Sequence, residues 1–458
     1  MGEEIYMYRE ALHYLEHIWF NDSDRKPLIL RGARQVGKTW IAREFAKNKA
    51  LTLVELNFER NPELKSLFDS NDPKIIMRNI ASYIGVDIKL ESSFLFLDEI
   101  QDAPEVLSKL RWFYEELPAL SLMAAGSLLE FILSDYSLSM PVGRVSYLYI
   151  EPFSFEEFLG ALDETMLLDY VKNFDITSPI PLALHQKLND LFRIYCHVGG
   201  MPACIAKWRE TQMFSSIIPV QEDLLATYKD DFYKYKGKLD VTRLLTILRS
   251  IPHQLGQKFK YSKADPTIQS PAAKQILKLF NQARICHNVQ LTAANSLPLN
   301  AEVKEKAFKQ IFLDVGLANC MLSNSLRLKD SKNIVDGGLS EQIVGQMLRT
   351  LFPLYKDPEL YYWQREEKGL EAEVDYLIES HGEIIPIEIK SGTAGTLKSL
   401  HYFMYLKGKK NSVRIYDGMP NITKVNVYLP NHQSEIRYQL LSIPFYLMQQ
   451  LPRILNSF

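Results

Sequence analysis

The chain has 458 residues, of which 47% are hydrophobic and 24% are charged, and its formal net charge at pH 7 is −2. This length exceeds what one hydrophobic core can organise and predicts about three domains. The composition is that of an ordinary globular protein, and the near-zero charge excludes a globally basic nucleic-acid-binding protein, so any contact with DNA has to be local. We find no apolar run long enough to span a membrane and no apolar signal region behind the acidic start of the chain.

Cysteine usage and repeats restrict the protein further. The four cysteines are far apart in the sequence and show neither a metal-binding nor a disulfide-like spacing: Cys196, Cys204, Cys286 and Cys320. Reduced, buried cysteines predict a cytoplasmic protein. The absence of an internal repeat excludes solenoid architectures.

The first strongly informative stretch follows a helical pattern over residues 6–20. Residues 28–39 combine a short apolar run with the pattern G-x-x-x-x-G-K-T, and residues 40–46 continue as a helix. A strand that turns tightly into a helix directs backbone N–H groups into one concavity, where phosphate oxygens bind. We therefore expect the phosphates of ATP to be bound by Gly32, Ala33, Arg34, Gln35, Val36, Gly37, Lys38 and Thr39. Lys38 would reach the β- and γ-phosphates, and the Thr39 hydroxyl would ligate Mg²⁺.

A second motif completes the expected nucleotide site. After a candidate strand over residues 51–57 and a helix over residues 72–83, residues 94–97 form an apolar run that ends in Asp98 and Glu99. Such a run suits a strand buried on both faces of a parallel sheet, and ligands bind at the carboxyl ends of these strands. Asp98 is expected to hold Mg²⁺, directly or through water, and Glu99 to polarise the attacking water.

The sheet is expected to continue with two more strands. Residues 104–117 read as a helix, residues 120–127 as a buried strand ending in a small polar residue, and residues 145–150 as the last strand of the sheet. The polar residue at the first strand end is Ser127, and Arg144 directly precedes the last strand.

The phosphate loop, the Asp98–Glu99 strand end, the Gly126–Ser127 strand end and the run from Gly143 to Phe158 resemble AAA+ ATPases of the archaeal and bacterial branch. The resemblance implies an α/β fold with a P-loop parallel sheet. It makes Ser127 a candidate sensor of the γ-phosphate and Arg144 a candidate arginine finger or sensor. The alternatives are a turn residue at Ser127 and a surface ion pair at Arg144. A finger that acts in trans would require a homo-oligomer.

Three helical patterns follow the sheet, over residues 182–198, 202–213 and 217–235. The turn Gly199-Gly200-Met201-Pro202 separates the first two. This set resembles the small helical lid that follows the ATPase sheet in the same family. We expect the lid to close on the nucleotide and to report the nucleotide state to the domain that follows.

The middle of the chain is expected to form a winged-helix-like domain. Helical patterns over residues 239–250 and 270–281 precede two strand candidates over residues 285–291 and 310–314, which we interpret as a β-wing. Units of this kind often bind duplex DNA.

The stretch between these helices is a candidate DNA contact. Lys258, Lys260 and Lys263 lie there with Phe259 and Tyr261 interleaved. The alternative is a structural linker with a solvated lysine face.

A second chemistry is expected near the C-terminus. Strand patterns over residues 371–379 and 384–390 flank the polar stretch 380–383. A four-residue hairpin loop there pairs Asp375 with Glu388 and Glu373 with Lys390. Alternation then places a set of apolar residues on one packed face: Val374, Tyr376, Ile378, Ile385, Ile387 and Ile389. Two opposed carboxylates about 5 Å apart at Cβ repel unless a cation lies between them, which predicts a divalent-metal site with Lys390 beside it.

Asp375 and the pattern Glu388-x-Lys390 resemble the PD-(D/E)xK nuclease superfamily. There, two acids hold Mg²⁺ or Mn²⁺, which activates water, and the lysine assists the reaction. The superfamily also places an acid on the preceding helix. Glu341, in the helical pattern 340–351, matches that position. The resemblance thus makes Glu341, Asp375 and Glu388 candidate metal ligands and Asp375, Glu388 and Lys390 candidate catalytic residues.

Two alternatives to this centre stay open. Glu341 could be a first-turn acid that complements the helix dipole. The hairpin face could be solvated and stabilised by a salt bridge between Glu373 and Lys390.

Nearly the whole chain resembles a prokaryotic ATPase family whose C-terminal domain of unknown function has a PD-(D/E)xK, restriction-endonuclease-like α/β fold. The expected domains are an AAA+ core, a helical lid, the winged-helix-like domain and the nuclease-like domain, at residues 1–160, 161–237, 238–330 and 331–458. Our first hypothesis is a Mg²⁺-dependent ATPase that couples nucleotide state to a nucleic-acid-binding or nuclease-like module. The alternative is a nucleotide-gated, protein-binding switch or scaffold with a catalytically inactive nuclease-like domain, in signalling or defence.

Overall fold

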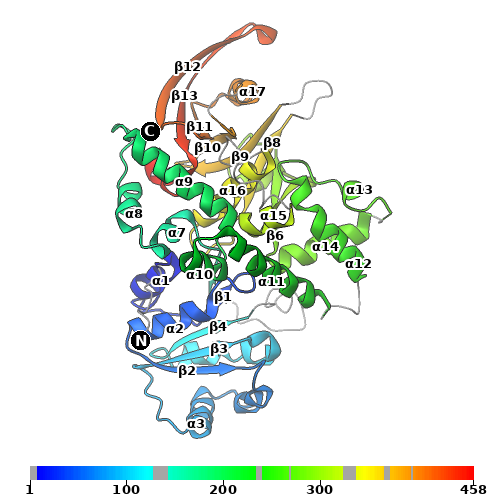
Figure 1. Cartoon of the computed structure of the whole chain (residues 1–458). Coiled ribbons are helices and arrows are strands. Elements are labelled where there is room, and N and C mark those ends of the chain that lie inside the picture. Colours follow the sequence, from blue (N-terminus) through cyan, green and yellow to red (C-terminus); the bar gives the residue numbers. More distant parts are fainter. Residues whose placement is uncertain are drawn as a thin grey trace.

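The computed structural model describes residues 8–126, 143–233, 240–267, 270–322, 337–365, 372–392 and 396–458. It contains two β-sheets, one formed by the N-terminal part of the chain and one by the C-terminal part, with a layer of helices between them (Figure 1). Within the described ranges, no helix is both long enough and apolar enough to cross a membrane.

The N-terminal sheet consists of five parallel strands. Their bounds are β1 Leu28–Arg31, β2 Thr52–Asn57, β3 Ser93–Asp98, β4 Ser121–Ala125 and β5 Ser146–Tyr149. The strand order is β2-β3-β4-β1-β5. β3 and β4 are buried at every position, as expected for continuous apolar runs inside a parallel sheet. Because β1 and β3 flank β4 in parallel, their carboxyl ends open at the same edge of the sheet.

Short helices accompany this sheet. They are α1 Glu10–Tyr14, α2 Lys38–Asn48, α3 Pro73–Ile84, α4 Pro104–Leu107 and α5 Leu110–Glu116. The Asp72 carboxylate caps α3 as expected, accepting the backbone N–H of Lys74 at 2.8 Å. The single helix expected over residues 104–117 is instead divided into α4 and α5. The Ser108 hydroxyl donates to the Glu105 carbonyl oxygen at 2.7 Å where they meet, a local bond of the kind that competes with helix continuation.

The expected lid helices are present between the two sheets (Figure 1). This layer comprises α7 Phe155–Ala161, α8 Thr165–Lys172, α9 Leu182–Val198, α10 Pro202–Thr211 and α11 Phe214–Tyr233. The prediction for α9 is confirmed at both ends, and Gly199, with φ of +79°, ends it.

The middle of the chain differs from the expected winged-helix-like domain. Its helices are α12 Val241–Ser250, α13 Tyr261–Ala264 and α14 Ser270–Gln282, and its strands are β6 Cys286–Thr292 and β7 Val303–Phe312. The two strands do not form a separate β-wing, because β6 also pairs in parallel with β8, Leu360–Gln364. β6 is thus an internal strand of a larger sheet, with β7 on one side and β8 on the other. The domain boundary expected at residues 330 and 331 therefore crosses one continuous sheet.

That second sheet has eight strands. The remaining ones are β9 Glu373–Ser380, β10 Glu383–Ile389, β11 Asn411–Tyr416, β12 Asn421–Leu429 and β13 Ser434–Pro444, and the order is β12-β13-β11-β10-β9-β8-β6-β7. Its helices are α15 Val315–Met321, α16 Gly337–Thr350, α17 Lys398–Lys407 and α18 Leu451–Leu455. β13 was not anticipated, and a 3₁₀ helix over Phe445–Gln450 follows it directly.

The hairpin of β9 and β10 has the register that the sequence predicts. Tyr376 lies opposite Ile387, and a two-residue turn with positive φ at His381 and Gly382 connects the strands. The expectation that Val374 and Tyr376 share one face is wrong, because the register of β9 against β8 shifts between them. Val374 belongs to the apolar cluster that contains residues of α17, whereas Tyr376 belongs to the cluster that contains residues of α16.

One apolar cluster joins the successive parts of the chain. It runs from α1 and α2 through the lid helices to α16 and α18. The other face of the N-terminal sheet has a cluster of its own, formed with α3, α4 and α5. The lid and the eight-stranded sheet thus share a core with one face of the N-terminal sheet.

Candidate functional site

The phosphate loop connects β1 to α2 at the carboxyl edge of the N-terminal sheet. Gly37 is the N-cap of α2, with φ of +99°. A Cβ at Gly32 would overlap the carbonyl oxygen of Ile150, so this position requires glycine. The loop therefore passes close to the end of β5, and its amides precede the N-terminus of α2, the geometry that binds phosphate.

Lys38 is buried, and its amine folds back onto the loop. Its Nζ donates to the carbonyl oxygens of Gly32, at 3.0 Å, and of Ala33, at 2.8 Å. Burial lowers the pKa of Lys38 to about 8, against the raising effect of Glu99 and Asp98. The amine thus lies inside the loop that would surround the phosphates.

Asp98 is the centre of a polar cluster formed by three strand or helix ends. The Thr39 hydroxyl is 3.3 Å from one Asp98 oxygen and 3.4 Å from the other, and Asn57 Nδ2 donates to Oδ2 at 3.1 Å. Burial and the neighbouring Glu99 raise the pKa of Asp98 to about 6. The hydroxyl and carboxylate oxygens are the donors that Mg²⁺ prefers, so the residues expected to hold Mg²⁺ do meet.

Glu99 follows β3 in a left-handed conformation, with φ of +51°. Its Oε2 accepts a hydrogen bond from Gln101 Nε2 at 2.6 Å. Gln101 in turn fills the space beside Gly126, where a Cβ would overlap its side-chain oxygen. The carboxylate that is expected to polarise water is therefore oriented by a neighbouring amide.

These residues border a cavity of about 610 Å³ that lid helices cover. The phosphate-loop side contributes Arg34, Gln35, Gly37, Lys38, Thr39, Trp40, Asp98, Glu99 and Gly126. The lid side contributes Pro202 and Ala203 from α10, and Val220, Asp223, Leu224 and Thr227 from α11. A nucleotide in this cavity would touch both the sheet and the lid.

Two further contacts join the lid to the loop. The Tyr228 hydroxyl donates to the Arg34 carbonyl oxygen at 2.9 Å, and the Arg34 guanidinium pairs with Asp231. Both partners belong to α11, so the position of this helix is tied to the backbone of the phosphate loop.

Of the two candidate sensors, the structure describes only Arg144. Ser127 lies outside the described residues. Arg144 is exposed and forms an ion pair with Glu115, with Nε 2.8 Å from Oε1, the arrangement of the surface alternative. It does not line the cavity beside Lys38, so a role as a finger in trans stays a prediction.

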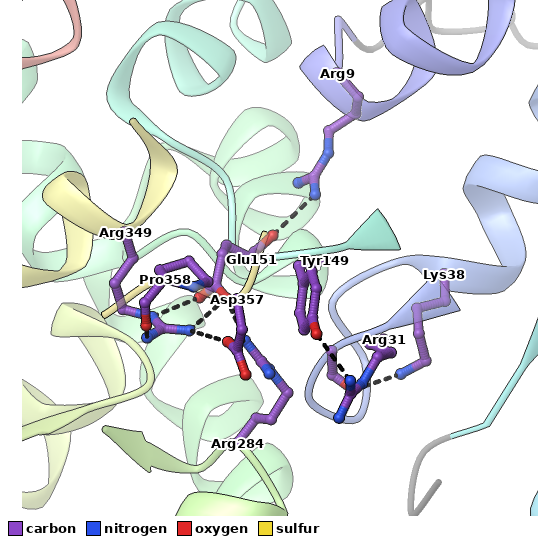
Figure 2. A network of polar contacts seen from close by, with 10 residues as sticks. Arg9, Arg31, Lys38, Tyr149, Glu151, Arg284, Arg349, Asp357 and Pro358 are labelled. Atoms are coloured by element: carbon purple, nitrogen blue, oxygen red, sulfur yellow. Dashed lines mark hydrogen bonds and ion pairs between the residues drawn. The ribbon is translucent and has the colours of Figure 1, made fainter. Parts of the chain in front are cut away.

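A buried ionic network joins the end of β5 to the eight-stranded sheet (Figure 2). Glu151 accepts from Arg349 of α16 and from Arg284, which follows α14. Burial opposes the charge of Glu151, but the two guanidinium groups hold its pKa well below the usual range. The Arg284 guanidinium also lies 4.9 Å from the ring centre of Tyr149, whose hydroxyl accepts from Arg31 at 2.8 Å. The network thus reaches the residue that precedes the phosphate loop.

The lid turn meets the eight-stranded sheet at Asp314. This carboxylate, fully buried at the end of β7, accepts the backbone N–H of Gly200 at 2.6 Å and the Gln346 side-chain amide of α16 at 3.1 Å. A Cβ at Gly199 would overlap Asp314. The paired glycines therefore make room for an acid that links the start of α10 to α16.

The acidic centre of the C-terminal sheet differs in composition from the predicted one. The carboxylates of Glu341, Glu373 and Asp375 lie within 4.8 Å of one another. Lys309 of β7 is buried among them and pairs with Glu341, at 2.7 Å, and with Glu373. Burial and Asp375 raise the pKa of Glu341 to about 8, against the lowering effect of Lys309. The alternative salt bridge between Glu373 and Lys390 is not formed, because Glu373 faces Lys309.

The other half of the predicted centre is the pair of Glu388 and Lys390. Lys390 Nζ donates to Glu388 Oε1 at 2.6 Å, and the second oxygen, Oε2, is buried without a hydrogen-bond partner. Burial and Asp375 raise the pKa of Glu388 to about 7. Asp375 itself accepts the backbone N–H of Ile389 at 2.7 Å. Asp375, Glu388 and Lys390 are therefore close together.

The candidate DNA contact is partly a packing element. Phe259 is buried and stacks on Phe308, with ring centres 6.0 Å apart, while Tyr261 meets both rings edge-on. Lys258 forms an isolated bridge with Lys309 of β7. The aromatic residues thus attach this stretch to the sheet, as the linker alternative requires.

Sequence reasoning missed several residues of these sites. Asn57 ends β2 beside Asp98, a position that the parallel pairing of β2 and β3 determines. Lys309 shares a strand face with Ala307 and Ile311, and a lysine on an apolar face is a recognisable sign of a buried partner. For Asp314 and Gln101, the sequence alone gives no sign of a role in these sites.

The strand order, the phosphate loop after β1 and the acid pair at the end of β3 define a P-loop nucleotide-binding protein of the ATPase type. Residues 24–159 match a family model described as an AAA domain. This part of the chain is therefore an AAA-type nucleotide-binding ATPase domain. Two further models, each described as a domain of unknown function, match residues 189–328 (DUF8612) and 336–434 (DUF4143). No curated protein sequence matched the chain.

Two solved structures that match the chain resemble it only weakly. The RuvB Holliday junction branch migration motor of Thermotoga maritima is 13% identical, with a TM-score of 0.30 over 62% of this chain and 90% of that one. A protein from Vibrio cholerae is 9% identical, with a TM-score of 0.19 over 94% of this chain and 97% of that one. TM-scores this low do not establish a shared architecture.

Proposed function

We propose that the protein binds ATP with Mg²⁺ in the cavity between the N-terminal sheet and the lid, and hydrolyses it there. The observation that carries this proposal is the meeting of Lys38, Thr39, Asp98 and Glu99 around one cavity that α10 and α11 cover. A phosphate loop, a magnesium-binding acid and an acid for the attacking water are the parts that nucleotide hydrolysis needs.

Each residue has a defined part in this proposal. Lys38 exchanges the carbonyls of Gly32 and Ala33 for the β- and γ-phosphates, while Thr39 and Asp98 hold Mg²⁺. Bound magnesium neutralises charge on the phosphates. Glu99, oriented by Gln101, positions the attacking water.

The lid is proposed to pass the nucleotide state to the eight-stranded sheet. α10 lines the cavity through Pro202, and two residues earlier Gly200 donates to Asp314. Asp314 also accepts from Gln346 of α16, the helix that carries Glu341. A shift of α10 on nucleotide binding would therefore affect the position of α16, the helix that contributes to the acidic centre.

One observation favours the second candidate for the C-terminal module, a binding switch with an inactive nuclease-like domain. Lys309 already pairs with Glu341, one of the acids expected to bind a catalytic metal, and with the neighbouring Glu373. We therefore propose that this module binds its partner, DNA or protein, without cleaving it. The four free cysteines are consistent with a cytosolic location for such a switch.

ATP hydrolysis by the purified protein tests the first proposal. Lys38→Ala and Glu99→Gln should each abolish Mg²⁺-dependent phosphate release. Lys47→Ala, on the exposed side of the same helix, is the matched lysine control and should behave as wild type. Turnover that persists in Lys38→Ala would refute hydrolysis at this loop.

DNA cleavage and binding assays separate the two forms of the module. Wild type should leave DNA intact with Mg²⁺ or Mn²⁺, with and without ATP. Metal-dependent cleavage that disappears in Asp375→Ala and Lys390→Ala would restore the nuclease hypothesis.

For Arg144 to act as an arginine finger, a homo-oligomer would have to present it to the nucleotide site of a second copy. Sedimentation with ATP can detect such an oligomer.

A further inference from the structure

The acidic centre under α16 contains a cation of its own. Lys309 belongs to β7, at one edge of the eight-stranded sheet, and its side chain extends toward the acids contributed by α16 and β9. Its Nζ lies 2.7 Å from Glu341 Oε2, pairs also with Glu373, and is 5.2 Å from the ring centre of Tyr362. The lysine side chain is only 2% exposed. Two carboxylates and an aromatic face thus surround the ammonium group.

A divalent cation does not fit this donor set. The metal expected from the nuclease resemblance would need Glu341, Asp375 and Glu388 as ligands, and Lys390 engages Glu388 Oε1 at 2.6 Å. Lys309 engages Glu341, and the Ile389 amide engages Asp375 Oδ2 at 2.7 Å. A divalent ion between these acids would lie beside a buried ammonium group, where repulsion between the two cations is only weakly screened.

The surroundings of the centre also restrict space. A Cβ at Gly256 would lie 2.8 Å from Glu341 Oε1, and the Tyr376 hydroxyl donates to the Glu341 backbone oxygen at 2.7 Å. The acid on α16 is thereby enclosed by β9 on one side and by the segment after α12 on another. These contacts restrict the position of Glu341 beside Lys309.

We propose that Lys309 takes the place of a divalent cation, so that Glu341, Glu373 and Asp375 form a lysine-closed centre that binds no metal while Lys309 is present. The ion pairs of Lys309 then hold α16 against the sheet. This is a structural role that a metal ion could otherwise fill. The inference concerns a different site from ATP hydrolysis and does not depend on it.

Manganese binding by the nucleotide-free, full-length protein tests the proposal. Mn²⁺ is titrated alone and followed by electron paramagnetic resonance. Wild type should bind no Mn²⁺ at this centre, whereas Lys309→Ala should gain one ion per chain. Adding Glu341→Gln to Lys309→Ala should weaken that new site by at least about tenfold, because a ligand is lost.

Matched variants separate charge from packing. Lys309→Arg keeps a cation between the acids and should gain no manganese site, and Lys263→Ala removes an exposed lysine and should also gain none. A wild-type protein that binds Mn²⁺ and loses it in Glu341→Gln would overturn the proposal. So would a folded Lys309→Ala that gains no site.

A second measurement keeps the proposal testable if Lys309→Ala does not fold. The melting temperatures of wild type and Glu341→Gln are then compared with and without Mn²⁺. Equal shifts in the two proteins support the lysine-closed centre. A larger Mn²⁺-dependent rise in wild type would show that Glu341 ligates metal in the presence of Lys309, and would overturn it. Because no nucleotide is added in any arm, failure here is distinct from failure of the ATPase proposal.

Discussion

The Arg349 guanidinium donates hydrogen bonds to both carboxylate oxygens of Glu151, with Nη2 2.8 Å from Oε1 and Nε 3.1 Å from Oε2. Glu151 follows β5, the edge strand of the N-terminal sheet, and Arg349 lies in the last turn of α16 (Figure 2). Nearby, the Tyr149 amide donates to the Leu354 carbonyl oxygen at 2.8 Å, so a C-terminal segment also covers the sheet edge. The ATPase sheet is therefore fastened directly to the helix above the acidic centre.

We expect Glu151→Ala to cost about 3–5 kcal/mol of folding free energy, because it removes the buried carboxylate shared by Arg349 and Arg284 and leaves them only the half-exposed Asp357. Urea unfolding followed by circular dichroism measures this. The matched control is Glu115→Ala, which removes the exposed partner of Arg144 and should change stability little. Equal effects of the two substitutions would contradict a structural role for the buried pair.

The same pair predicts acid sensitivity. The pKa of Glu151 is depressed in the folded protein, because the attraction of Arg349 and Arg284 outweighs its burial. Its contribution to stability is thus complete above the pKa of an unfolded glutamate and is lost as the pH falls toward the folded value. Acid unfolding should therefore be shallower in Glu151→Gln than in wild type, which pH titrations of the unfolding free energy can compare.

Gly199→Ala tests the fit between the lid turn and Asp314. Gly199 has φ of +79° and ψ of −177°, and a Cβ would overlap the buried carboxylate. We expect a loss of about 1–3 kcal/mol or more. Gly408→Ala is the control, because Gly408 also has positive φ but open space around its Cα. Its cost should be limited to about 1–2 kcal/mol of backbone strain. A smaller loss at Gly199 than at Gly408 would contradict close packing of the turn.

Local patterns predicted the parts of the molecule whose partners are near in sequence. The phosphate loop and the register of the hairpin from Glu373 to Ile389 depend on turn chemistry and alternation, and both are present in the structure. The role of Lys309 was missed because its partners on α16 and β9 are distant in the sequence. The β-wing prediction failed because the local sequence patterns of β6 and β7 are the same in a wing and at the edge of a larger sheet.

The pH dependence of nucleotide binding follows from Asp98 and Lys38. The folded pKa of Asp98 is raised to about 6 and that of Lys38 is lowered to about 8. Mg²⁺ prefers ionised Asp98 and phosphate prefers charged Lys38, so affinity for magnesium ADP should be highest between these values. For Asp98 the raised pKa also means that the nucleotide-free fold loses stability as the pH rises from about 4 to 6. Calorimetric titrations across pH measure the affinity, and Asp98→Asn should remove the acidic limb alone.

Gln101 is expected to act through Glu99. Its amide donates to Glu99 Oε2 at 2.6 Å, so Gln101→Ala leaves the carboxylate without this support but does not alter the phosphate loop. We expect kcat for ATP hydrolysis to fall by about tenfold or more, less than the 10²–10⁴-fold typical of losing a general base, while the dissociation constant of magnesium ADP stays unchanged. Steady-state kinetics and nucleotide titration measure the two quantities. A weaker affinity with unchanged kcat would instead show that Gln101 shapes the cavity, and loss of folding would make it a packing residue beside Gly126.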